Sequence, residues 1–358
     1  MLISDIARLR LHAQQVSKHT CKTPQALVSY MGALQAQDFP ASKYAVGARL
    51  PNTTLKQVEK AVNKGEIIRT WIFRGTLQLV TPADIRWMIE LVKDRLEMRL
   101  KATEKALGVD ATIYPHVFKL LREALQGGKR LMRSEVESLL QTHHIGPEYM
   151  RYGLFRASLE GIICHGPMNG KQFTFTLLDE WCPPQPAYSK EKALELLAER
   201  YFTSHGPATI ADFTTYAGIT QKEGLIGLEA AKPRLDQLTI AGNTYWCGKD
   251  LLAAKTGVPN ALLLPAFDEI NVAYKDRLPM IAKEHGHKVM TINGIFHPVM
   301  LNEGQICGLW KRTIAKDGLE ISFEPFISLK KSRKEEFEAA VQHYADFMEL
   351  PVKKMAFL

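Results

Sequence analysis

A helix–helix–hairpin pattern recurs three times along the first two thirds of the chain, with a period of roughly 75 residues. In each copy a Ser or Thr precedes a short helix, a longer helix follows, and two short runs rich in β-branched and aromatic residues end the copy. This period is too long for a solenoid repeat, and helices followed by a two-stranded ribbon are typical of a winged helix. We therefore expect three tandem winged-helix units. The paired β runs are 67–72 with 75–80, 162–164 with 173–177, and 238–240 with 245–247.

Proline and a change of pattern mark the domain boundaries. Pro183, Pro184 and Pro186 predict a stiff linker after the second copy, and from residue 259 short β runs replace the repeat. These runs are 289–292, 298–301, 305–310 and 319–323, and an amphipathic helix follows over 332–350. The expected fold class is α+β, with a small antiparallel β-barrel and a C-terminal helix after the winged helices. The expected domains are winged helix 1 at 1–110, winged helix 2 at 111–182, winged helix 3 at 187–258, and the barrel with its helix at 259–358.

Composition excludes several protein classes. The N-terminal residues carry charge early and form no apolar signal region, and no apolar run reaches the roughly 18 residues that a membrane span requires. The five cysteines are scattered and none forms a CxxC pair, while the histidine pairs at 143–144 and 285–287 lack further ligands at useful spacing. We therefore expect a cytoplasmic, nucleoid-associated protein with reduced thiols, without membrane contact, metal or other cofactor.

The positive charge is concentrated at the start of the chain. The net charge is +8, and residues 1–110 hold 17 Lys and Arg against 10 Asp and Glu. Nearly all of the excess therefore belongs to the first predicted winged helix. Such a surplus is compatible with phosphate binding but does not require it.

Two glutamines, Gln35 and Gln37, interrupt the apolar pattern of the first repeat. Leu27, Val28, Met31 and Leu34 have the spacing of a helix face, and the polar segment follows them. Residues two apart diverge on a helix but point the same way on an extended chain, so both amides can share one target if the helix ends near residue 34. The alternative is that both amides merely bind loop backbone at a helix end.

Amides restrict the chemistry that such a pair could perform. A glutamine has no useful pKa and cannot act as a general base, but it can orient water or face a developing positive charge with its carbonyl dipole. Such modest assistance suffices only for a good leaving group.

Three blocks of sequence, in order along nearly the whole chain, resemble the AlkZ-like (AlkZ/YcaQ) family of bacterial DNA glycosylases, which are winged-helix DNA-binding proteins. The AlkZ-like branch carries Gln-x-Gln and the YcaQ-like branch Gln-x-Asp, and this chain has Gln35-Ala36-Gln37, with Asp38 one position beyond the Asp site. The blocks are 34–37 with 69–77, 263–269 with 274–277, and 294–299.

The resemblance implies a monofunctional DNA glycosylase. It would hydrolyse the N-glycosidic bond of N7- or N3-alkylated purines in double-stranded DNA, with interstrand crosslinks as a further candidate substrate. Gln35 and Gln37 would be the catalytic residues. No catalytic lysine is implied, so the product would be an abasic site without strand cleavage, and we expect a monomer.

Several residues near the first hairpin are candidates for DNA contact. Arg74 and Gly75 lie at its tip or shoulder, where an arginine can reach phosphate or a groove. Many relatives carry His where this chain has Gln78, which leaves open a different substrate range or a loss of activity. Arg49 is a further phosphate candidate from the same segment. The expected DNA-binding residues are Lys43, Arg69, Arg74, Gly75, Thr76 and Gln78.

Two other interpretations compete with these assignments. The chain could be a non-enzymatic winged-helix regulator, although regulators usually read palindromes as dimers with one module per half-site. The charged block formed by Asp268, Glu269 and 275–277 could be a catalytic carboxylate patch. We favour for it a charged network that holds the barrel region to the third winged helix.

Overall fold

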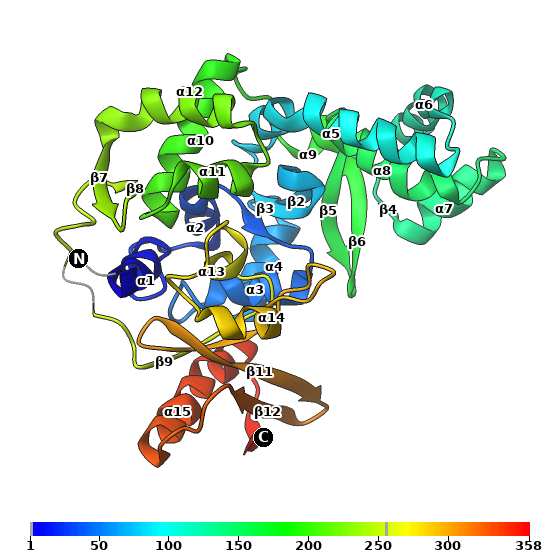
Figure 1. Ribbon diagram of the computed structural model, residues 1–358. Coiled ribbons are helices and arrows are strands. Elements are labelled where there is room, and N and C mark those ends of the chain that lie inside the picture. Colours follow the sequence, from blue (N-terminus) through cyan, green and yellow to red (C-terminus); the bar gives the residue numbers. More distant parts are fainter. Residues whose placement is uncertain (1–2, 255–256) are drawn as a thin grey trace. The chain divides into compact units, whose positions relative to one another are not determined.

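The computed structural model describes residues 3–254 and 257–358 and divides into two compact units (Figure 1). Unit 1 holds the chain up to Glu59 and again from Leu194 to Leu358, and unit 2 holds Lys60–Ala193. The mixture of helices and sheets confirms the α+β class. The division into four domains stays a prediction.

Unit 2 is built from the first hairpin and the complete second repeat. Strands β2 and β3 form an antiparallel hairpin in which Thr70 pairs with Gln78 and Trp71 with Leu77. The second hairpin, β5 with β6, is extended by β4 into a three-stranded sheet of order β4-β6-β5. The elements are β2 (Ile68–Trp71), η1 (Phe73–Gly75), β3 (Leu77–Val80), α5 (Ile85–Leu107), η2 (Ala111–Ile113), α6 (Tyr114–Leu125), β4 (Leu131–Met132), α7 (Arg133–Thr142), α8 (Glu148–Leu159), β5 (Ile163–Asn169), β6 (Gln172–Leu177) and α9 (Leu178–Trp181).

A continuous apolar core joins the helices and sheet of unit 2. Helices α6, α7 and α8 turn their apolar faces inward, for example Leu121, Val136 and Leu154, each at most 1% exposed. The side chains of these helices pack in the same buried cluster as Ile163 and Phe175 of the β5/β6 hairpin. Burial at the 3.6-residue period of the helices is what the sequence pattern predicted for this repeat.

Unit 1 contains the glutamine segment, the third repeat and the C-terminal region. Helices α4 and α10 each run across the boundary between the units. The elements are α1 (Ile3–Ala13), α2 (Pro24–Met31), β1 (Leu34–Gln35), α3 (Phe39–Gly47), α4 (Leu55–Asn63), α10 (Lys190–His205), α11 (Ile210–Ala217), α12 (Gln221–Ala231), η3 (Lys232–Arg234), β7 (Leu235–Ile240), β8 (Asn243–Gly248), β9 (Ala261–Leu264), α13 (Glu269–Val272), η4 (Lys283–His285), α14 (Gly286–Val289), β10 (Val299–Asn302), β11 (Gln305–Ala315), β12 (Gly318–Pro325), α15 (Lys331–Met348) and β13 (Val352–Phe357).

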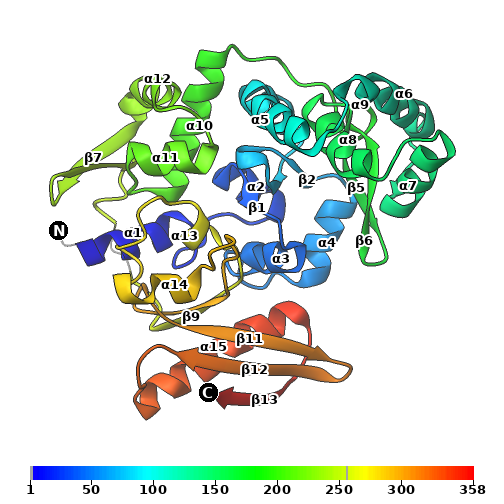
Figure 2. The ribbon, with the colours of Figure 1, turned by 45° about the vertical axis from the view of Figure 1, so that its right-hand side comes forward.

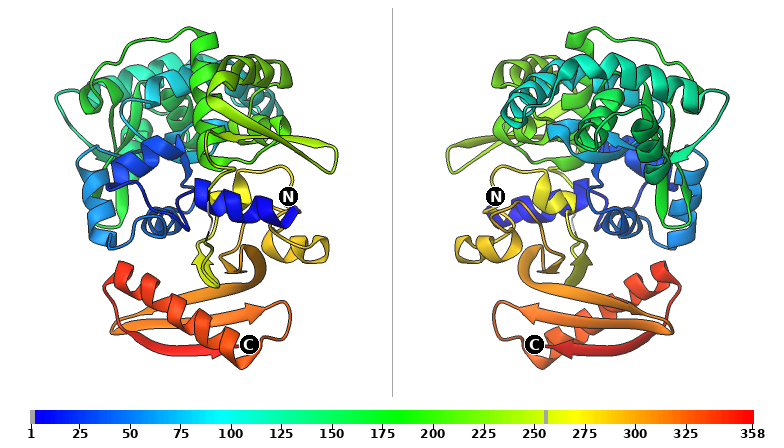
Figure 3. Two further views of the ribbon diagram at one scale, coloured as in Figure 1. Left: turned by 90° about the vertical axis from the view of Figure 1, so that its left-hand side faces the viewer. Right: turned by 90° about the vertical axis from the view of Figure 1, so that its right-hand side faces the viewer.

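Threonine side chains cap the helices that the sequence assigned to them. Thr23 accepts a hydrogen bond from the backbone N–H of Ala26 and starts α2, with Pro24 in the first turn. Thr209 and Asp212 form a reciprocal capping box at the start of α11. Because caps satisfy N–H groups that have no partner inside the helix, they fix where each helix begins. Figure 3 shows the β7/β8 ribbon that follows these helices extending away from them.

The C-terminal strands form an open sheet instead of the predicted barrel. Their order is β13-β12-β11-β10-β9, and within the described residues the edge strands β9 and β13 do not pair with each other. The sheet is also not wholly antiparallel, since β12 and β13 are parallel. A parallel pair requires a crossover connection, and α15 provides it.

Helix α15 lies against this sheet (Figure 2). Aromatic side chains of the helix and the sheet pack together between them. Trp310 of β11 is fully buried, lies 5.2 Å from the ring of Tyr344, and donates its indole N–H to the carbonyl of Leu264 at 2.8 Å. Tyr44 of α3 joins the cluster, 4.7 Å from Tyr344. The C-terminal sheet and the segment after the glutamine pair therefore share one core.

Most predicted elements are present, with one clear error. The predicted strand at 289–292 is wrong, because α14 ends at Val289 and only an isolated bridge joins Met290 to Phe296. All three hairpins and the helices before them are confirmed as elements. Within the described part of the chain, no helix is long and apolar enough to cross a membrane.

Candidate active site

Helix α2 ends before the two glutamines. Gly32 follows its last residue with φ of +80°, a value that glycine adopts at little cost. Tyr216 of α11 then holds the chain by donating its hydroxyl to the carbonyl of Ala33 at 3.2 Å. The chain continues in the extended conformation of β1. The glutamine pair therefore lies outside a helix, as a shared target for both amides requires.

The two glutamine side chains differ in exposure. Gln35 is 7% exposed, whereas Gln37 is an exposed residue in the bend that follows β1. A ligand in solution can reach the Gln37 amide directly, while the Gln35 amide is largely covered.

A buried carboxylate fixes the backbone at Gln35. The backbone N–H of Gln35 donates to Oε1 of Glu269 at 2.6 Å, and Glu269 is 1% exposed. A hydrogen bond to an ionised acceptor is about twice as strong as one between neutral groups. Glu269 begins the short helix α13, for which the carboxylate of Asp268 caps the N–H of Ile270.

The adjacent residue, Asp268, forms a buried ion pair with Arg49. Both carboxylate oxygens accept from the Arg49 guanidinium at 2.8 Å, and both side chains are fully buried. Burial alone would lower the pKa of Arg49, but the Asp268 carboxylate, with smaller contributions from Glu269 and Tyr274, outweighs burial and raises it. Arg49 also donates to Gln14, whose amide donates to the hydroxyl of Tyr274. The expectation that Arg49 binds phosphate is therefore wrong, since this guanidinium is sealed inside the protein.

A second buried pair joins α1 to α11. Arg10 lies 3.5 Å from the Asp212 carboxylate, and both side chains are fully buried. The other oxygen of Asp212 accepts from the backbone N–H groups of Lys275 and Asp276 at 2.9 and 3.1 Å. The guanidinium of Arg10 stacks 3.6 Å from the ring centre of Tyr274. Helix α1 and the segment after α13 accordingly lie side by side (Figure 3).

These contacts decide the role of the charged block at 268–277. It holds α11 through Asp212, as predicted for the third repeat, and it also holds the first repeat through Arg49 and the backbone of Gln35. The carboxylates of Asp268 and Glu269 are used within the fold. The structure therefore supports the charged-network interpretation over a catalytic carboxylate patch.

A neutral histidine lies beside Glu269. Nε2 of His205 is 3.8 Å from Oε2 of Glu269, and both side chains are buried. Burial lowers the pKa of His205, and the neighbouring Glu269 opposes this without reversing it. His205 is consequently uncharged at neutral pH.

Two further candidates in this segment have structural partners. Asp38, the minor catalytic candidate, caps α3 by accepting from the N–H of Ala41 at 3.0 Å. Lys43 is 7% exposed and pairs with Glu59 at 2.6 Å. A phosphate would have to replace Glu59 to bind Lys43, and its DNA contact stays a prediction.

The remaining DNA-binding candidates lie on the β2/η1/β3 hairpin of unit 2. Arg74 and Gly75 form its turn with φ of +60° and +73°, and Arg74 is half-buried. Thr76 accepts from the Gln78 amide at 2.8 Å. Gln78 itself is 1% exposed. Arg69 lies on the face of β2 opposite to Gln78, because Gln78 pairs with Thr70 and neighbouring residues alternate.

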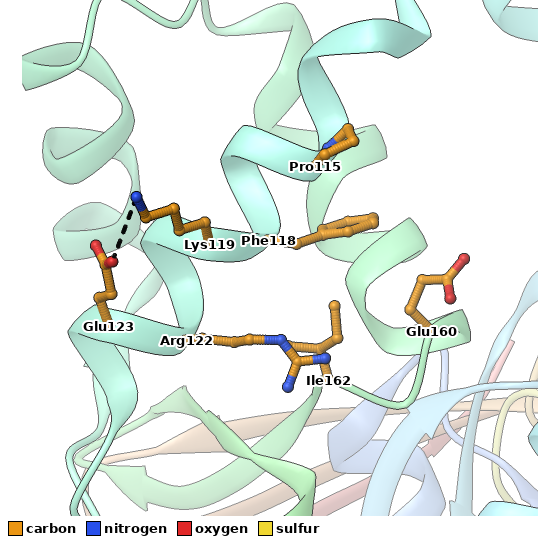
Figure 4. A pocket seen from close by; sticks show the side chains of 7 residues that line it. All are labelled: Pro115, Phe118, Lys119, Arg122, Glu123, Glu160 and Ile162. Carbon is orange, nitrogen blue, oxygen red and sulfur yellow. Dashed lines mark ion pairs between the residues drawn. The ribbon is translucent and has the colours of Figure 1, made fainter.

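A surface hollow on α6 of unit 2 is lined by charged side chains (Figure 4). Lys119 and Arg122 line it together with Glu123 and Glu160, and Lys119 lies 3.9 Å from Glu123. Two positive and two negative groups leave no net charge to attract phosphate. This hollow therefore adds nothing to the candidate site.

The sequence did not reveal the buried residues that hold the glutamine segment in place. Arg10, among the apolar residues of α1, and Gln14, in the turn directly after this helix, were the available local signal. The charged block that contains Glu269 was recognised, but nothing local linked Glu269 to Gln35 or pointed to His205, because their partners are distant in sequence.

Comparison with known proteins identifies the family. The family described as DNA glycosylase AlkZ-like matches residues 28–347. An interstrand DNA cross-link repair glycosylase of Streptomyces sahachiroi is 25% identical over 334 residues, covering 84% of this chain and 85% of that protein. The solved structure of the Streptomyces sahachiroi DNA glycosylase AlkZ has the same fold, with a TM-score of 0.82 at 21% identity over 99% of both chains. The chain belongs to the AlkZ-like family of DNA glycosylases.

Proposed function

We propose that this protein is a monofunctional glycosylase that hydrolyses the N-glycosidic bond of N7- or N3-alkylated purines in duplex DNA, with Gln35 and Gln37 as its catalytic residues. The observation that carries the proposal is the anchoring of the Gln-Ala-Gln segment. Tyr216 binds the carbonyl of Ala33, and Glu269 binds the N–H of Gln35, so both contacts precede the exposed Gln37. A fixed backbone allows amide dipoles to be oriented before the substrate arrives.

The chemistry follows from what amides can do. Gln37 orients a water molecule toward the anomeric carbon, and the amide carbonyls face the positive charge that develops on the deoxyribose. Neither glutamine accepts a proton. The reaction relies on the leaving group, and a purine alkylated at N7 or N3 already carries the charge that makes it leave.

The substrate range extends to interstrand crosslinks. The Streptomyces sahachiroi relative is named for interstrand DNA cross-link repair. A crosslink through N7 of guanine is chemically an alkylated purine, so the same glycosidic bond breaks and the product is an abasic site.

DNA binding falls to the three helix-and-hairpin segments, each acting as a winged helix in a monomeric protein. The hairpin with Arg69, Arg74, Gly75, Thr76 and Gln78 contacts the duplex backbone and groove, and Lys43 adds a phosphate contact. The basic surplus of residues 1–110 supports this assignment.

The decisive experiment measures abasic-site formation on a duplex with one N7-methylguanine. Gln35→Ala and Gln37→Ala are compared with the wild type and with Gln25→Ala, which removes an exposed amide from α2. We expect excision by the wild type and Gln25→Ala, and its loss in both motif variants with DNA binding retained. Binding without excision of this substrate or of a nitrogen-mustard crosslink would point instead to a non-enzymatic regulator.

A further inference from the structure

A hollow of about 440 Å³ is lined by residues of unit 2 alone. Strand β2 borders it with Arg69 and Trp71, the β5/β6 hairpin with His165 and Phe173, and α7 with Arg133 and Glu137. Ligand pockets commonly have volumes of about 300–1,000 Å³, so this one can hold a nucleotide-sized group.

Aromatic rings form one wall of the hollow. The ring centre of His165 lies 5.1 Å from Trp71 and 5.0 Å from Phe173, and Trp71 and Phe173 are only half-buried. The guanidinium of Arg69 stacks 4.8 Å from the ring centre of Phe173. Half-buried aromatic rings beside arginines are the surfaces on which unstacked bases bind.

His165 presents a hydrogen-bond acceptor. It is 7% exposed, and its Nδ1 lies 3.1 Å from the carbonyl oxygen of Arg69. A carbonyl only accepts, so Nδ1 carries a proton. Burial, and then the charges of Arg69 and Arg133, lower the pKa of His165 to about 3, so the ring is neutral and Nε2 carries none.

The charges around the hollow restrict the ligand further. Arg69 and Arg133 supply two positive charges, and the carboxylate of Glu137 supplies one negative charge and further acceptors. The net charge of +1 suits a single phosphodiester. A base that binds neutral His165 and Glu137 must present N–H donors, and guanine presents three on one edge, at N1 and at its exocyclic amine.

We propose that this hollow binds one unstacked guanine nucleotide of DNA, with the base against Trp71 and Phe173, its N–H edge on His165 and Glu137, and its phosphodiester on Arg69 and Arg133. The proposal rests on the proposed function only in taking DNA as the ligand. It adds a second DNA-reading site, one that requires local unstacking of the duplex.

The test compares two undamaged duplexes, one with a single bulged guanine and one with a bulged tetrahydrofuran abasic analogue. Both carry the same number of phosphates and one unpaired nucleotide, so the ratio of their dissociation constants reports mainly on the base. We expect the wild type to prefer the bulged guanine about tenfold, in line with one stacked and hydrogen-bonded base. Equal affinity for the two duplexes would overturn the proposal.

Three variants locate that preference. His165→Phe keeps the ring and removes the acceptor, and Glu137→Gln alters the second acceptor at a half-buried site of α7. Each should reduce the preference about threefold to tenfold. Arg133→Gln should weaken both duplexes equally and more than Arg151→Gln, which removes the same charge from an exposed site on α8 outside the hollow. An unchanged guanine preference in both His165→Phe and Glu137→Gln would overturn the assignment to this hollow.

The outcome is independent of excision, because neither duplex contains an alkylated base. Excision of N7-methylguanine by the same variants is measured in parallel. A guanine preference that depends on His165 would stand even if no excision occurred, and excision could be confirmed even if the preference were absent.

Discussion

The carboxylate of Glu269 accepts the backbone N–H of Gln35 at 2.6 Å, across 234 positions of sequence. Glu269 does not reach the substrate in the proposed mechanism. It acts as a positioning residue, because it fixes the main chain from which the proposed catalytic amide projects.

Replacing Glu269 should therefore affect the turnover number more than DNA affinity. We expect Glu269→Ala to lower kcat about tenfold to hundredfold, since a buried charged hydrogen bond is lost and the amide is misplaced. Glu269→Gln keeps a carbonyl acceptor and should recover most of kcat. Single-turnover excision and binding to an uncleavable duplex separate the two effects, and a loss confined to DNA affinity would exclude a positioning role.

The buried pair of Arg49 and Asp268 should dominate the stability of unit 1. Asp268→Ala leaves a fully buried guanidinium without its partner and is expected to cost about 3–5 kcal/mol of unfolding free energy. Lys331→Ala is the control, because it breaks a solvent-exposed pair with Glu335 and should cost less than about 1 kcal/mol. Urea denaturation followed by circular dichroism measures both, and equal costs would contradict the assignment.

The buried His165 predicts a loss of stability on acidification. Its pKa is about 3 in the folded protein against 6.5 for an ordinary histidine, so between these values the unfolded chain binds more protons than the folded chain. Stability must therefore fall as the pH falls through this window, by about 2 kcal/mol at pH 5. His165→Phe removes this titrating group and with it the contribution of His165 to the pH dependence of stability. The drop in unfolding free energy between pH 7.5 and pH 5 should be smaller in the variant, and an identical drop would show that His165 titrates normally.

Salt dependence can distinguish two of the predicted phosphate ligands. If Arg74 contacts a phosphate, Arg74→Gln should reduce the slope of log K against log salt concentration by about 0.9. Lys43→Gln serves as the comparison, because a phosphate contact by Lys43 has to replace its pair with Glu59 and should reduce the slope by less. Fluorescence anisotropy titrations at several salt concentrations give both slopes. The opposite pattern would assign the phosphate to Lys43.

The turn of the first hairpin should not tolerate a side chain at Gly75. Its φ is +73°, and an added Cβ would lie 3.3 Å from Cζ of Phe155. Gly108 has a similar φ of +67°, and a Cβ added there would have no atom within 4 Å. Gly108→Ala therefore measures only the loss of unfolding free energy that comes from the left-handed backbone, about 1 kcal/mol. Gly75→Ala should cost about 2 kcal/mol because contact strain is added. Thermal unfolding compares them, and equal losses would mean that Phe155 gives way freely.

Local patterns in the sequence predicted local structure well. The repeating pattern predicted helices before each hairpin, as found for α6 over Tyr114–Leu125, and a Ser or Thr before a short helix, as found for Thr209 at the start of α11. The extended conformation at Gln35 also agrees with the spacing of the two glutamines. In each case the deciding interactions lie within a few residues of the signal.

Long-range pairing was where prediction from the sequence failed. A closed barrel was expected, but the last strand, β13, returns alongside β12 through the α15 crossover and leaves an open sheet. The 289–292 run has strand-like residues, yet the chain forms a short helix that ends at Val289. The link from Glu269 to Gln35 had no local signal at all, since each residue acquires its partner only in the folded chain.

The contact between Gln35 and Glu269 also sets an order of events during synthesis. A ribosome makes the Gln-Ala-Gln segment first, and adding the residues up to Glu269 takes about ten seconds or more at ordinary elongation rates. Until then the nascent chain carries the two amides without the carboxylate that fixes their backbone. A polypeptide that terminates before Glu269 would thus contain the Gln-Ala-Gln motif without the carboxylate that fixes its backbone. Such an incomplete chain would not have the ordered motif that we propose for excision.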